Sequence, residues 1–194
     1  MMDKIGKNVT IVGMRYIITV ILFCSALSAF SYDMWQYKSP DTPVQLSYPA
    51  YWTIAESADE LYISNSARYL NADQVASPGA VSLYLLHGPA DAVEAEFDTD
   101  DGLRGVQMAI FQEAFTSRTL DAYRYFEFNT REKEFANAAG LITPYYHNEN
   151  DVVIASLRFP EHYVVMVGVT RPGEIPQHID TILAILDSVQ VSGN

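Results

Sequence analysis

The C-terminal third of the sequence constrains the fold most, because three strand-like segments follow one another there with short turns between them. Leu141–His147, Asp151–Phe159 and His162–Thr170 are rich in β-branched and aromatic residues. Turn-forming residues separate them at Asn148–Asn150 and Pro160–Glu161. Strands joined by short turns pair antiparallel, so we predict an antiparallel meander.

The last segment, residues 171–191, predicts an amphipathic helix that closes the domain. Its apolar residues recur at helical spacing, at Ile175, Ile179, Ile182, Leu183 and Leu186. We expect Leu183 to lie near the centre of the contact with the sheet. The polar residues Gln177, Asp180 and Asp187 are then expected to face solvent.

The N-terminal half contains further strand-like segments. Four short segments there are rich in aromatic and β-branched residues, and prolines or acidic turn residues separate them. They are residues 34–39, 44–49, 52–57 and 60–67. They predict a meander. Residues 79–88 are apolar enough to lie inside a sheet.

In the middle of the chain, the spacing of the apolar residues changes from that of a strand to that of a helix. From Gly102 onward, apolar residues at three- and four-residue steps predict a helix packed on the sheet, with Asp100 or Asp101 as its N-cap. These apolar residues are Leu103, Val106, Ile110, Phe111 and Ala114. Residues 122–140 alternate in the manner of a strand, and we predict a strand there.

The N-terminus has the pattern of a secretory signal peptide. Arg15 precedes the apolar run Ile17–Cys24, which is followed by small residues up to Ser31. A retained membrane helix is the alternative, but the apolar segment is shorter than the roughly twenty residues that span a bilayer. We predict a signal peptide at 1–31, cleaved after Ser31 or slightly earlier, and a single domain at 32–194 without a membrane span.

Cys24 is the only cysteine, and it lies within the predicted signal peptide. Phe23 precedes it, whereas a lipid-modified cysteine follows a small residue, so lipidation is not expected. The mature chain then has no cysteine. This excludes disulfides, thiolate nucleophiles and cysteine-ligated metals.

Charge and motifs exclude several function classes. The formal net charge is −12, which disfavours nucleic acid and anionic lipid as partners. The sequence has no G-x-S-x-G, H-E-x-x-H, phosphate-loop or dinucleotide motif. We therefore expect no standard motif-bearing enzyme, although paired carboxylates for glycoside hydrolysis leave no sequence pattern.

The acidic segment EAEFDTDDG (94–102) contains the candidate metal ligands Asp98, Asp100 and Asp101. Their oxygens suit a hard cation such as calcium. However, Gly102 falls one position early for a calcium loop, and Ala109 stands where a bidentate glutamate is needed. A solvated loop capping the next helix is the alternative, and no other cofactor is predicted.

A second candidate site consists of Tyr145, Tyr146 and His147, which lie beside a predicted turn. Aromatic residues with polar tips can contact a protein partner or a sugar. The alternative is that alternate residues of this strand are half-buried for packing alone.

The order of elements resembles the PsbP-like proteins and their bacterial DcrB-like relatives. The resemblance rests on LSYPAYW (46–52), AAG (138–140) and IDTILAILDSVQV (179–191). It implies an α+β fold, an α/β/α sandwich with a central, mainly antiparallel sheet and a C-terminal helix packed on it. It also implies an extracytoplasmic accessory role, as PsbP has at the lumenal face of photosystem II.

Three functions remain compatible with the sequence. The first is an exported, periplasmic or secreted non-enzymatic module that assists an envelope or membrane-associated complex by binding a protein partner. The second is a secreted hydrolase with paired carboxylates, and the third is a carrier of a small ligand or cation. The oligomeric state and the identity of the partner stay open.

Overall fold

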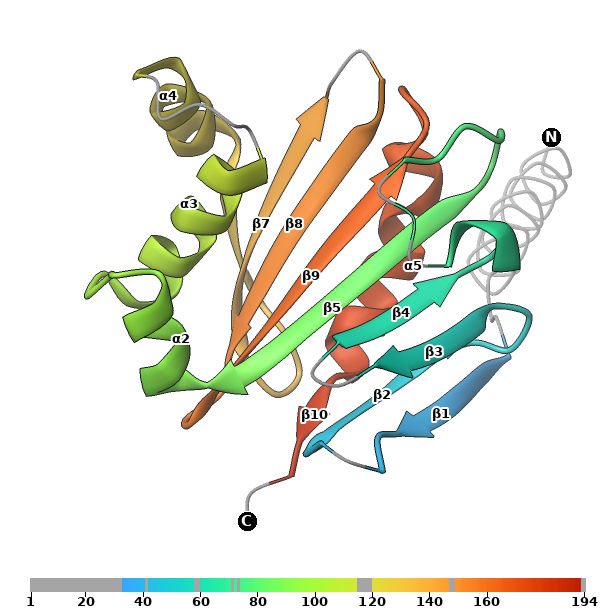
Figure 1. Ribbon diagram of the computed structural model, residues 1–194, viewed down its shortest axis with the longest axis horizontal. Helices are drawn as coiled ribbons and strands as arrows, with labels where there is room; N and C mark the ends of the chain where they lie inside the picture. Colours follow the sequence, from blue (N-terminus) through green and yellow to red (C-terminus); the bar gives the residue numbers. More distant parts are fainter. Residues whose placement is uncertain are drawn as a thin grey trace, which may run out of the picture. The chain divides into compact units, whose positions relative to one another are not determined.

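The strands of the C-terminal third lie at the centre of a large antiparallel sheet (Figure 1). The computed structural model describes residues 33–40, 42–57, 60–70, 72, 74–114, 120–146 and 149–192. Within them, seven strands pair in the order β3 (Thr53–Ser57), β4 (Glu60–Ser64), β5 (Val81–Pro89), β9 (His162–Thr170), β8 (Asp151–Arg158), β7 (Ala139–Tyr146) and β6 (Arg131–Glu134). The predicted C-terminal meander is β7–β8–β9, and β5 lies inside the sheet as expected. The predicted signal peptide, with Cys24, falls outside the described residues.

A second, smaller sheet corrects the prediction of one N-terminal meander. Among the described residues it consists of β1 (Met34–Lys38), β2 (Val44–Pro49) and β10 (Gln190–Val191), with β2 in the middle. The chain turns after β2, so β3 and β4 join the large sheet instead. The buried side chains of β2 pack in the same core as the C-terminal helix. The two-residue β10 is too short to produce a sequence pattern.

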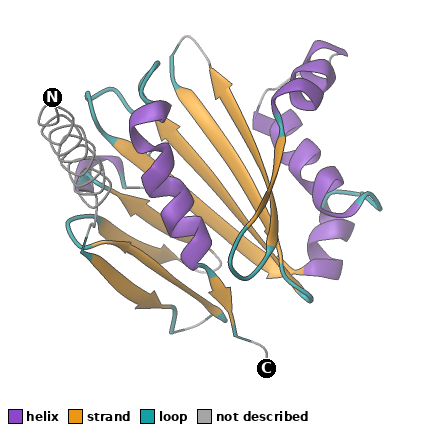
Figure 2. Cartoon of the chain, turned by 180° about the vertical axis from the view of Figure 1, so that it is seen from behind, coloured by secondary structure: helices purple, strands orange, loops and turns teal. Residues whose placement is uncertain are grey.

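The C-terminal helix α5 (Ile175–Ser188) lies across one face of the large sheet, as Figure 2 shows from behind. Its predicted docking is confirmed, but its rotation differs from the prediction. Ile182 and Ile185 are fully buried, whereas Leu183 is only half-buried. The buried residues follow three- and four-residue steps from Ile175, and Leu183 lies on the flank of that stripe.

Three helices pack against the opposite face of the sheet: α2 (Ala90–Glu96), α3 (Gly102–Ala114) and α4 (Leu120–Asn129). The side chains of β8 and β9 alternate between the two faces. Ile154 and Val165 belong to the core under the three helices, whereas Val153 and Val164 belong to the core under α5. The predicted α+β sandwich, helix–sheet–helix, is therefore confirmed.

Helix α4 corrects the strand predicted for residues 122–140. The chain is helical up to Asn129, and strands follow only at β6 and β7. Ala122 and Phe126, four residues apart, are buried, while Phe128 is 75% exposed. The segment is rich in tyrosine and phenylalanine, which favour strands, but packing against α3 overrides that local preference.

Helix α2 was not predicted. It has seven residues, starts directly after Pro89, and buries only Ala90. Such a short helix has no complete apolar stripe for sequence periodicity to reveal.

A buried polar network fixes α3 on the sheet. The fully buried Gln107 donates hydrogen bonds from Nε2 to Thr143 Oγ1 at 3.0 Å and to the Ile154 carbonyl at 2.9 Å. Its Oε1 accepts a hydrogen bond from the Ser156 hydroxyl. Because buried polar groups without partners are costly, this network sets the position of α3 relative to β7 and β8.

None of the helices in the described part of the chain is long and apolar enough to cross a membrane.

Candidate functional site

A cavity of about 310 Å³ lies between the helices α2 and α3 and the β4–β5–β9 part of the sheet. It is lined by Glu60, Leu86, His87, Val93, Glu96, Phe97, Ile110, Tyr163 and Val165. Its size is at the lower end of that of small-molecule sites.

Strand register brings the residues of the cavity floor together. Glu60 of β4 is paired with Leu86 of β5, and Leu86 is paired with Val165 of β9. Cross-strand partners lie about 5 Å apart on one face, so these three side chains form a continuous row. The end of α2 supplies the wall with Val93 and Glu96.

Glu60 is held by two tyrosines of the same sheet face. One carboxylate oxygen accepts a hydrogen bond from the Tyr84 hydroxyl at 2.8 Å, and the other accepts one from the Tyr62 hydroxyl. The two tyrosine rings stack, with centroids 5.3 Å apart. The hydrogen bonds from Tyr62 and Tyr84 lower the pKa of Glu60, because they favour the charged carboxylate. Glu60 is therefore a fixed negative charge at neutral pH.

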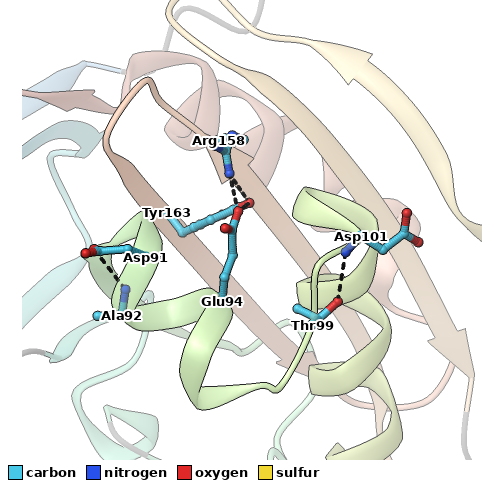
Figure 3. A network of polar contacts seen from close by, with 7 residues as sticks. All are labelled: Asp91, Ala92, Glu94, Thr99, Asp101, Arg158 and Tyr163. Atoms are coloured by element: carbon cyan, nitrogen blue, oxygen red, sulfur yellow. Dashed lines mark hydrogen bonds and ion pairs between the residues drawn. The ribbon is translucent and has the colours of Figure 1, made fainter.

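A second network attaches α2 to the sheet next to the cavity (Figure 3). Glu94 Oε1 accepts hydrogen bonds from the Tyr163 hydroxyl at 2.6 Å and from Arg158 Nη1 at 2.5 Å. Arg158 and Tyr163 are cross-strand partners on β8 and β9, and the guanidinium carbon lies 4.9 Å from the centre of the tyrosine ring. This network, the Glu94 clasp, holds the helix that carries Val93 and Glu96.

The Glu94 clasp predicts a pH dependence. The hydrogen bond from Tyr163, followed by that from Arg158, lowers the pKa of Glu94 below its ordinary 4.5. A carboxyl with a lowered folded-state pKa contributes stability above its unfolded pKa, and this contribution is lost as the pH falls through the folded pKa. In a ¹³C NMR titration, we expect a Glu94 midpoint below 4.5. It should move upward in Tyr163→Phe, and an unchanged midpoint in that variant would contradict the geometry.

The cavity combines an apolar interior with negative charge. Among the described residues that line it are two glutamates and one histidine, and neither a lysine nor an arginine. The apolar side chains can remove a ligand from water, while the carboxylates can orient a positively charged or hydrogen-bond-donating group. The arrangement is suited to binding.

The predicted metal ligands lie in the turn between α2 and α3. Asp98, Asp100 and Asp101 are all exposed, and Asp98 adopts a positive φ of 47°. The Asp101 amide donates to the Thr99 hydroxyl oxygen at 3.3 Å, as Figure 3 shows. Within the described residues, no group of three or more His, Cys, Asp or Glu is arranged to hold a metal ion. Calcium binding at this turn stays a prediction.

Tyr145 and Tyr146, two of the three predicted partner-binding residues, lie on opposite faces of the sheet. Tyr145 packs on the helix-covered face, with its ring 5.5 Å from that of Tyr125 and 6.2 Å from that of Phe111. Tyr146, the next residue of the strand, faces the other side and is 55% exposed. His147 lies outside the described residues. A role of these residues in partner binding stays a prediction.

Sequence reasoning identified part of the cavity only indirectly. Glu94 and Glu96 belong to the acidic segment considered as a possible ion site, but neither the contact of Glu94 with the sheet nor the place of Glu96 in the cavity wall was predicted. Glu60 and Tyr163 are about a hundred residues apart, and no local pattern connects them.

Comparisons with solved structures find similar folds at low sequence identity. LpqN of Mycobacterium tuberculosis, described as involved in cell envelope biogenesis, is 12% identical with a TM-score of 0.47, over 83% of this chain and 92% of that chain. Cyanobacterial PsbP (CyanoP) of Synechocystis sp. PCC 6803 is 11% identical with a TM-score of 0.43, over 84% and 95%. A Bacteroides thetaiotaomicron VPI-5482 protein is 8% identical with a TM-score of 0.44 over 82% of this chain, which spans about half, 48%, of that protein.

The PsbP-like resemblance predicted from the sequence is thus found again as a resemblance of fold. No protein-family model matches the sequence. A comparison with curated proteins gives no match either. Because the identities are below 25% and each TM-score is below 0.5, the solved structures say nothing about what this chain binds.

Proposed function

We propose that this chain is an exported, non-enzymatic binding module, and that it assists an envelope or membrane-associated complex by holding a protein partner at the α2–α3 cavity. The cavity is the observation that carries the proposal. It combines apolar walls with two carboxylates, Glu60 and Glu96, which is the composition of a recognition site. The export pattern of residues 1–31 supports a location outside the cytoplasm.

Site-specific crosslinking in the native envelope tests this function. In the exported full chain, Phe97→p-benzoylphenylalanine places a photoreactive group on the cavity wall. We expect ultraviolet light to produce a crosslinked species of defined mass from this position.

The matched control is Leu183→p-benzoylphenylalanine, because Leu183 is half-buried on α5, on the other side of the sheet. It should give no such species. The proposal fails if Phe97 gives no crosslink, or if both positions give the same crosslink with equal yield.

A further inference from the structure

We infer that the cavity accepts the basic side chain of a protein partner, a lysine or arginine whose aliphatic stem is buried and whose charged end meets Glu60 and Glu96. The inference rests on the proposed function, because it names the chemical group that the binding module recognises. Three features carry it: the charge of the lining, its apolar area, and the way the chain holds its own Arg158.

The charge of the lining selects for a cation. Glu60 approaches from β4 and Glu96 from the end of α2, so two carboxylates from separate elements face one cavity. Tyr62 and Tyr84 fix both oxygens of Glu60, and its lowered pKa keeps it ionised. The described lining residues include no lysine or arginine to neutralise this charge. A cation entering the cavity is therefore attracted, whereas an anion is repelled.

The apolar part of the lining selects for an organic ion. Leu86, Val93, Phe97, Ile110 and Val165 make up most of the wall. Lysine and arginine bury the methylene groups of their stems against apolar surface and keep the charged end at a polar partner. A bare metal ion, by contrast, prefers several oxygen ligands. The cavity thus matches a long, flexible side chain with a positive end.

The chain itself shows the same mode of recognition next to the cavity. Glu94 pairs with the guanidinium of Arg158 while the ring of Tyr163 lies 4.9 Å from the guanidinium carbon. Tyr163 also lines the cavity. Glu60, which lines the cavity, is likewise paired with tyrosines, because the hydroxyls of Tyr62 and Tyr84 donate to its carboxylate. A carboxylate with nearby aromatic rings is a favourable environment for a guanidinium or ammonium group.

Calorimetric titration of the exported chain with small probes tests the inference. The probes are Nα-acetyl-lysine N-methylamide, which represents a protein side chain, and hexylamine, hexanol and hexanoate. We expect the blocked lysine and hexylamine to bind, hexanol to bind at least about tenfold more weakly because it forms no charge-assisted hydrogen bond, and hexanoate not to bind. Equal affinities of hexylamine and hexanol would overturn the inference.

Variants that each remove one carboxylate charge test whether the blocked lysine binds in the cavity. Glu60→Gln and Glu96→Gln are each expected to weaken binding of the blocked lysine by about tenfold or more, since each removes a charged acceptor. Glu132→Gln on the edge strand β6 removes the same charge at an exposed position and should change the affinity by less than about twofold. Glu96 is exposed, so its variant stays interpretable if Glu60→Gln impairs folding. Equal losses in Glu96→Gln and Glu132→Gln would overturn the inference.

The blocked lysine and hexylamine together distinguish recognition of a protein side chain from recognition of a free amine. Binding of hexylamine without binding of the blocked lysine would exclude a side chain of a partner. Crosslinking at Phe97 together with no preference for cations would leave the proposed function standing and remove this inference alone.

Discussion

Replacing Phe126 by alanine is expected to lower the free energy of unfolding by about 3–5 kcal/mol, as is typical of a buried phenylalanine. Phe126 is fully buried, with its ring centroid 5.7 Å from that of Phe111 of α3. The Arg104 guanidinium carbon lies 5.3 Å from the centre of the same ring. The variant removes this contact between α4 and α3 and leaves a cavity. Urea unfolding monitored by circular dichroism measures the loss.

Phe128→Ala is the matched control, two residues further along the same helix. Its side chain is 75% exposed, so we expect a change within about 0.5 kcal/mol. The pair distinguishes a helix from the strand that the local sequence favours. In a strand, residues two apart share one face, and both substitutions would then have similar effects. Similar losses for Phe126→Ala and Phe128→Ala would contradict α4.

Replacing Ile182 by alanine is expected to cost about 2–5 kcal/mol, because it empties the centre of the contact between α5 and the sheet. Ile182 is fully buried, and its Cδ1 lies opposite Gly168 of β9. A Cβ atom at Gly168 would be 2.8 Å from Val153, 3.0 Å from Leu83 and 3.5 Å from Ile182. The missing side chain at Gly168 leaves space for Val153 and Leu83, and Ile182 packs beside them. Chemical denaturation of the variant measures the loss.

Two substitutions on α5 serve as controls for Ile182. Asp180 is exposed, so Asp180→Ala should change the free energy of unfolding by no more than about 0.5 kcal/mol. Leu183 is half-buried, and Leu183→Ala should have an effect between those of the other two variants. A larger loss for Leu183→Ala than for Ile182→Ala would mean that α5 is rotated relative to the position described.

The sequence by itself determined those elements in which apolar residues recur at regular spacing and turn residues mark the ends. The bounds of β2 and β9, the beginning of α3 at Gly102 and the packing of α5 on the sheet all follow from local patterns. In α5 the exact buried stripe did not follow, because four adjacent apolar residues, Ile182, Leu183, Ala184 and Ile185, fit more than one rotation of a helix. Burial of Ile182 and Ile185 in the core against the sheet selects one rotation.

Only the tertiary structure decided α4, the division of the N-terminal strands between two sheets, and the cavity. Tyrosine and phenylalanine in residues 122–129 favour a strand locally, whereas the burial of Phe126 against α3 is a nonlocal interaction that no short stretch of the sequence reveals. The cavity depends on the same kind of information. Glu60, Glu96 and Tyr163 come from separate strands and a short helix, and strand register together with the Glu94 clasp brings them to one space. Local sequence encodes which residues prefer which element, whereas the meeting of distant side chains is set by the packing of those elements.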